Sequence, residues 1–240
     1  MRFIIEIMLF MVILLCTWNG YKKGLVMCIG GILAIIVSLY VGDLLASTFT
    51  PAVTPAVHPF VSGYMDGNEG KINSTLSELL GSDSTLSIED AIKQNPDIKT
   101  ELCVKSFEKV GVFSSTAEVM AADAISTADE SGSTLSAAII NVLCNDFTYY
   151  IIFLIFFAIA LIIFTVLGNI FNLSFKIPEM DKLNDVGGIV AGAVKGILFC
   201  IIIVWALKFT GALFPEDELK HTLLTALFLK MNILSHCLTI

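Results

Sequence analysis

Charged side chains are scarce in this sequence. Lysine, arginine, aspartate and glutamate together make up 15% of its 240 residues, and hydrophobic residues make up 56%. In a typical soluble domain, charged residues account for about a quarter of the total. The shortage of charge therefore excludes an ordinary soluble domain and indicates a membrane protein.

Residues that commonly carry catalysis are also few or scattered. The three histidines lie far apart, at His58, His221 and His236. The six cysteines form no C-x-x-C pair, and most of them fall in or beside apolar stretches, where a free cysteine behaves as a small apolar side chain. We recognise no paired carboxylates and no activated nucleophile. We therefore expect no enzymatic activity, no cofactor, and no catalytic, cofactor-binding or metal site.

Four apolar segments predict transmembrane helices, at about 3–20, 24–42, 147–168 and 187–209. The clearest begins at Phe147, where 21 residues without a charge are long enough to cross a hydrocarbon core of about 30 Å. The first is short, and a signal peptide is the alternative, but no small-x-small cleavage site follows it. We predict an all-α membrane protein that retains this first helix.

A polar insertion separates the two expected membrane hairpins, 1–42 and 147–209. Residues 43–146 contain fifteen acidic residues and five lysines, a net charge of −10. Prolines at every fourth position, Pro51, Pro55 and Pro59, predict a stiff exit from the membrane surface. Capping signals at Thr75–Glu78 and Asn95–Pro96 predict short helices. One of these helices is expected to have a shared face made by Ile98, Leu102, Phe107 and Val110.

The last segment, 210–240, is predicted to form an amphipathic helix. Pro215 suits a first helical turn, and the three acidic residues that follow it suit the positive end of a helix dipole. The helix is expected either to lie in the membrane interface or to dock on the bundle. Its apolar stripe consists of Leu219, Leu223, Leu227, Met231 and Leu234.

The distribution of lysine predicts the orientation. Lys22, Lys23, Lys176 and Lys182 lie in the short connections, whereas the insertion has no lysine or arginine within twenty residues of either bounding span. Because basic loops stay on the cytoplasmic side, we expect the insertion and both termini to face outward. A membrane-impermeant thiol reagent should then reach Cys103 in intact cells.

Four residues recur in the same order 172 positions apart: Lys23, Gly24, Cys28 and Ile29 are matched by Lys195, Gly196, Cys200 and Ile201. A pair of related membrane hairpins would explain this pattern, as in transporters built from parallel repeats. Chance similarity between two apolar helices is the alternative. The sequence leaves both open.

Two rows of small residues predict close helix packing. One is Gly188, Gly192 and Gly196 in the fourth span, and the other is Gly30, Ala34, Ser38 and Gly42 in the second. Small residues at every fourth position let two helix backbones approach each other in a membrane. The partner helix could lie in the same chain or in another copy, so a homo-oligomer stays open.

Lys195 lies about nine residues into the fourth predicted span. A lysine at that depth is costly unless it reaches water or a partner. It could mark a substrate or ion path as a functional intramembrane charge, or its side chain could extend back to the cytoplasmic face. Glu6 would lie near the opposite surface and is a poor partner.

Two stretches, Asn19–Leu25 and Asp185–Leu198, each contain a lysine followed by glycine. With the four spans, they resemble the colicin V production (CvpA) family of bacterial inner-membrane proteins. The resemblance implies a multi-pass protein of the cytoplasmic membrane that is linked to toxin production or export and to envelope upkeep. It carries over no functional residue, and the long insertion departs from the family pattern.

We therefore expect a non-enzymatic membrane protein that acts through membrane or secretion partners. A small transporter or channel is the alternative, and a sensor or adhesion scaffold acting through the acidic insertion is a third class. The lipid bilayer is an expected partner, and nucleic acid is not.

Overall fold

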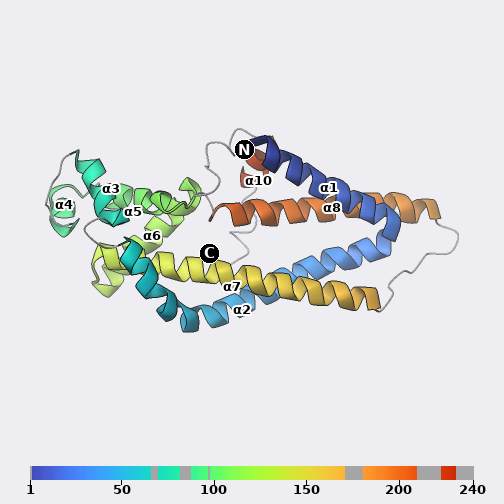
Figure 1. Cartoon of the computed structure of the whole chain (residues 1–240), viewed down its shortest axis with the longest axis horizontal. Helices are drawn as coiled ribbons and strands as arrows, with labels where there is room; N and C mark the ends of the chain where they lie inside the picture. The colour runs from blue at the N-terminus through green and yellow to red at the C-terminus, as the bar shows by residue number, and fades with distance from the viewer. Residues whose placement is uncertain are drawn as a thin grey trace. The chain divides into compact units, whose positions relative to one another are not determined.

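The computed structural model describes residues 2–65, 70–81, 88–96, 98–170, 181–209 and 223–230. In this part of the chain the regular elements are all α-helices, which confirms the predicted all-α fold. Figure 1 shows their order. They are α1 (Arg2–Lys23), α2 (Leu25–Met65), α3 (Lys71–Leu80), α4 (Ile88–Gln94), α5 (Ile98–Lys109), α6 (Ser114–Ser131), α7 (Leu135–Ile170), α8 (Asp181–Leu207) and α10 (Leu223–Lys230).

Four of these helices, α1, α2, α7 and α8, are long and apolar enough to cross a membrane. They contain the four predicted spans, except for one residue at the start of the second and two at the end of the fourth. Many of their large apolar side chains are exposed, among them Ile4, Phe10, Leu33 and Ile162, and lipid is the medium in which such exposure is stable. The 41 residues of α2 measure about 60 Å, twice a hydrocarbon core, so only part of this helix lies in lipid.

The chain divides into two compact units. We call the first the membrane unit: it holds α1, α2 as far as Thr48, α7 from Ile151, α8 as far as Ala206, and α10. The second, the insert unit, holds the rest of α2, the helices α3 to α6, α7 as far as Tyr150, and Leu207–Phe209. On α2 the insert unit begins at Phe49, a few residues after the start of the predicted 43–146 insertion. On α7 it ends at Tyr150, a few residues after the end of that insertion.

The insert unit has its own apolar core, to which α5 contributes one face. Ile98, Leu102 and Phe107 are buried in it, and Val110 packs against it half-buried, which confirms the predicted shared face. α5 packs against α3 and α6. Two ion pairs join the same helices: Lys109 bonds Glu78 of α3 at 2.7 Å, and Lys99 bonds Asp129 of α6 at 2.6 Å.

One local expectation about the insertion needs correction. Thr75 does not cap a helix, because α3 begins earlier, with Gly70 as its N-cap, and the Thr75 hydroxyl donates to the Lys71 carbonyl at 2.7 Å.

The proline stretch is part of α2 itself. Each proline leaves the carbonyl four residues before it without a backbone donor, and those residues, Ser47, Pro51 and Pro55, are exposed. Solvent can therefore supply the missing hydrogen bonds.

Cys103 is fully buried in the core of the insert unit. Burial raises the pKa of its thiol to about 12, although Lys99 acts in the opposite direction. Since thiol reagents attack the thiolate, both access and reactivity are suppressed. The expectation that an external reagent would reach Cys103 is therefore wrong, whichever side of the membrane the insert unit faces.

In the membrane unit, α8 lies against α1 through its glycine row (Figure 1). A methyl group added to Gly192 would lie 2.6 Å from the Cys16 carbonyl oxygen and 3.0 Å from the Thr17 Cα. One added to Gly196 would lie 2.8 Å from the Ile13 Cα. Gly188 meets the backbone of Gly20 and Gly24 in the same way. The two backbones are thus so close that side chains larger than hydrogen do not fit between them.

The turn between α1 and α2 is held by α8. Gly24 has a φ of +80°, which favours glycine, and it allows α2 to begin at the next residue. The Leu25 N–H, which has no partner within its own helix, donates to the Asn184 side-chain oxygen at 3.0 Å. Asn184 is buried, so this hydrogen bond fixes the α1–α2 turn against α8.

The members of the second row of small residues do not all face the same neighbour. Gly42 faces α7, where an added methyl group would lie 3.2 Å from the Phe157 Cβ. Ser38 is buried, and its hydroxyl donates to the Ala34 carbonyl at 2.6 Å. Gly30 and Ala34 instead border a cavity described below.

The C-terminal helix α10 packs against α1, so it docks on the bundle. Its buried residues include Thr225 and Phe228, whereas Leu227 of the predicted apolar stripe is exposed. The predicted face was therefore wrong at this position. Leu219, Met231 and Leu234 lie outside the described residues.

Replacing Gly192 with leucine should destabilise the membrane unit, because the new side chain would overlap the α1 backbone. We expect a loss of about 1–3 kcal/mol or more, seen as a lower midpoint of thermal unfolding in detergent. Ile201→Leu is the control, since it conserves volume and should change the midpoint little. An unchanged midpoint in Gly192→Leu would show that α8 does not pack on α1.

The orientation can be tested at exposed positions of the insert unit. Ser77 in α3 and Ser126 in α6 are both exposed. Cysteines placed there should react with an impermeant maleimide in intact cells, while Cys103 of the parent protein should stay unlabelled before and after lysis until the protein is denatured. If the new cysteines reacted only after lysis, the insert unit would face the cytoplasm.

Candidate functional site

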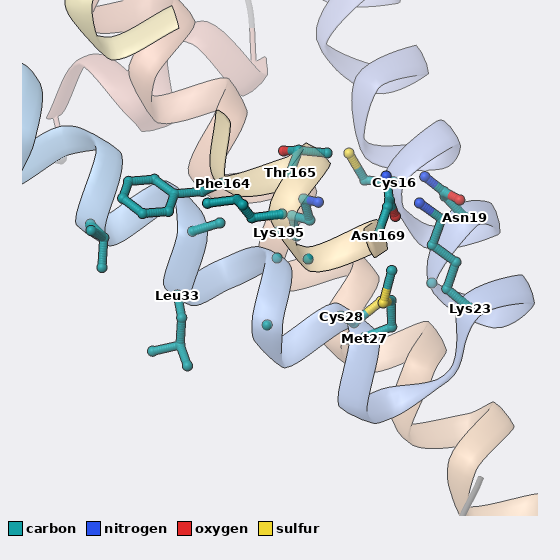
Figure 2. Close-up of a pocket in the computed structure, with 17 residues that line it drawn as sticks. Cys16, Asn19, Lys23, Met27, Cys28, Leu33, Phe164, Thr165, Asn169 and Lys195 are labelled. Atoms are coloured by element: carbon teal, nitrogen blue, oxygen red, sulfur yellow. The ribbon is translucent and has the colours of Figure 1, made fainter. Parts of the chain in front are cut away.

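The membrane unit contains a cavity of about 330 Å³ to which all four candidate spans contribute. We call it the lysine cavity, and Figure 2 shows its lining. α2 supplies most of one wall and the C-terminal part of α7 supplies another, with α1 and α8 completing it. The lining residues are Cys16, Asn19, Gly20, Lys23, Met27, Cys28, Gly30, Gly31, Leu33, Ala34, Val37, Phe164, Thr165, Leu167, Gly168, Asn169 and Lys195.

Lys195 reaches this cavity because α2 has glycine opposite it. A methyl group added to Gly31 would lie 2.7 Å from the Lys195 Nζ, so the missing side chain leaves room for the ammonium group. The same Nζ lies 6.0 Å from the centre of the Phe199 ring, one turn further along α8, within the range of a cation–π contact. In the part of the chain that the structure describes, no carboxylate lies within ion-pair distance of it.

Three polar lining residues lie toward the α1–α2 turn. Asn19 and Lys23 lie in the last turns of α1, and Asn169 lies near the end of α7. Leu33 and Phe164 lie on the other side of the cavity (Figure 2). The cavity therefore has one side suited to a charged or hydrogen-bonding group and another suited to an apolar group.

The recurring Lys-Gly motif occupies two different environments. Gly24 forms the break between α1 and α2, whereas Gly196 lies inside α8 against Ile13. The two copies therefore do not hold equivalent positions in two similar hairpins, and the structure does not support a structural repeat. Lys23 and Lys195 nevertheless both line the lysine cavity.

Other residues singled out from the sequence lie apart from the cavity or give no site. Gly188, Gly192 and Gly196 contact α1, and Ser38 and Gly42 pack within the bundle. His58 bonds Asn141 at 3.0 Å in the insert unit. Among the described residues, no group of three or more histidine, cysteine, aspartate or glutamate side chains is placed to hold a metal ion.

The sequence reasoning identified Lys195 but missed the cavity around it. The signal that could have found it is the adjacent pair Gly30–Gly31, because only one glycine of such a pair can belong to a row of small residues. The second, Gly31, is the one that makes room for the lysine. Asn184 was missed as well, since a hydrogen bond between residues 159 positions apart leaves no local pattern.

Comparison with known proteins gives a family match. A family model described as "Colicin V production protein" matches residues 113–232, which include α6, α7, α8 and α10. The match begins inside the predicted insertion, and the stretch Asn19–Leu25 lies outside it. No curated protein and no solved structure matches the chain. Because the family match extends over half of the sequence, the chain belongs to the colicin V production protein family.

Proposed function

We propose that this protein is a non-enzymatic component of the bacterial cytoplasmic membrane that assists toxin production or export, or envelope upkeep, through partner proteins. The family match supports the proposal. The four apolar helices support residence in a membrane. The lysine-poor flanks of the insertion support an orientation with the insert unit outside.

A surface for a protein partner is available on the insert unit. Phe60 and Tyr64 lie one helical turn apart on α2, and they are 80% and 55% exposed. Phe60 follows Leu25 by 35 residues, whereas a membrane span needs about 20, so one straight span beginning at Leu25 would end well before it. Exposed neighbouring aromatic residues of this kind are typical of protein contact sites.

The proposal is tested by deleting the gene and measuring two phenotypes, the amount of toxin released and growth in the presence of detergent. The parent gene should restore whichever phenotype is lost. The double variant Phe60→Ala/Tyr64→Ala should restore it at least about tenfold less well, because aromatic contacts often dominate interface energy. Lys93→Ala removes an exposed side chain from the same unit and should behave as the parent. If deletion changed neither phenotype, the proposal would be wrong.

A small transporter or channel is the second candidate, and the lysine cavity is the observation that favours it. The cavity places a positive charge among four candidate membrane helices. Purified protein in liposomes should then pass an anion or a current, and Lys195→Gln should reduce this flux. Absence of flux under a range of anion and proton gradients would exclude this candidate.

A further inference from the structure

We infer that the lysine cavity is a binding site for a membrane lipid with an anionic head group. The head group would lie beside Lys195 and Lys23, and the first part of an acyl chain would lie between α2 and α7. This inference depends on neither proposed function, because a lipid can be bound by a transporter, an accessory protein or a scaffold.

The charge of the lining selects an anion. Among the described lining residues there are two lysines and no aspartate or glutamate. Lys195 is half-buried, its Nζ lies 6.0 Å from the centre of the Phe199 ring, and among the described residues no carboxylate forms an ion pair with it. A cation among membrane helices is normally stabilised by an opposite charge or by water. A phosphate or carboxylate in the cavity would provide the opposite charge.

Neutral hydrogen-bonding groups accompany the lysines. Asn19 comes from α1, and Thr165 and Asn169 come from α7, so the polar side of the cavity is approached from two helices. Amide and hydroxyl groups can bond phosphate oxygens or the glycerol hydroxyls of a lipid head. A cavity of about 330 Å³ lies at the lower end of the range for small-molecule sites, so it suits a head group with a short part of a chain.

The apolar side of the cavity favours a lipid over a water-soluble anion. Leu33 and Val37 of α2 and Leu167 of α7 line the cavity, and the same three side chains are 56%, 41% and 41% exposed. They lie on two helices whose exposed surfaces suit hydrocarbon. The cavity is therefore open where acyl chains would surround the protein, and a ligand can enter from the bilayer without crossing water.

The test measures lipid retention by the purified full-length protein in a neutral detergent. Native mass spectrometry with added phosphatidylglycerol or phosphatidylcholine gives the bound fraction of each. The parent should retain phosphatidylglycerol in preference to phosphatidylcholine. Lys195→Gln should weaken this binding by about tenfold or more, as expected when a hydrogen bond to a charged group is lost, and Lys195→Arg should retain it.

Lys22→Gln is the matched control. Lys22 is exposed, lies beside Lys23 in sequence and contacts the Trp18 ring at 5.3 Å, but it does not line the cavity. It should bind phosphatidylglycerol as the parent does. If Lys195→Gln fails to fold, Ala34→Leu fills the cavity while keeping the lysine, and it should lose phosphatidylglycerol in the same way.

Four results would overturn the inference. Equal retention of the two lipids would show that the head-group charge is not recognised. Equal loss in Lys22→Gln and Lys195→Gln, or full retention in both Lys195→Gln and Ala34→Leu, would place the lipid on the outer surface of the bundle. Thermal stabilisation by inorganic phosphate that depends on Lys195, without retention of phosphatidylglycerol, would identify a site for a free anion and not for a lipid.

Discussion

The membrane unit depends on the backbone contact between α1 and α8. In a bilayer, apolar side chains gain little by leaving lipid for another helix, so association relies on close van der Waals packing. Gly188, Gly192 and Gly196 allow that packing because they bring no side chain to the interface. With α8 in this position, Asn184 can bond the Leu25 N–H and close the α1–α2 turn. One row of glycines thereby positions three of the four candidate spans of the membrane unit.

The Lys195–Gly196 pair serves both the packing and the cavity. Neighbouring residues of an α-helix point about 100° apart, because a turn contains 3.6 residues. Gly196 can therefore face the Ile13 backbone of α1 while Lys195 points into the space beside Gly31 of α2. The lysine is held in the cavity by the same contact that holds α8 to α1, so its position follows from the packing of the helix and needs no ion pair.

Sequence reasoning predicted what depends on local composition and periodicity. Hydropathy located the membrane helices, and the spacing of Ile98, Leu102 and Phe107 located the buried face of α5. It did not predict that the glycine row packs against α1, because such a row is compatible with any neighbouring helix whose backbone can approach closely. It predicted that a thiol reagent would reach Cys103 because the insertion was expected to face outward, whereas this side chain is buried where α5 packs against α3 and α6.

The lysine cavity combines residues from inside and outside the family match. Residues 113–232 supply Lys195, Phe164, Thr165 and Asn169, whereas Lys23, Gly31 and the α2 wall come from the unmatched part. Neither part would form the cavity alone: without Gly31 the ammonium group would meet a side chain, and without α8 the α2 wall would have no cation deep in the bundle. The matched half and the unmatched half therefore each supply one of the two lysines, Lys195 and Lys23, and the shape of the cavity comes largely from the first hairpin.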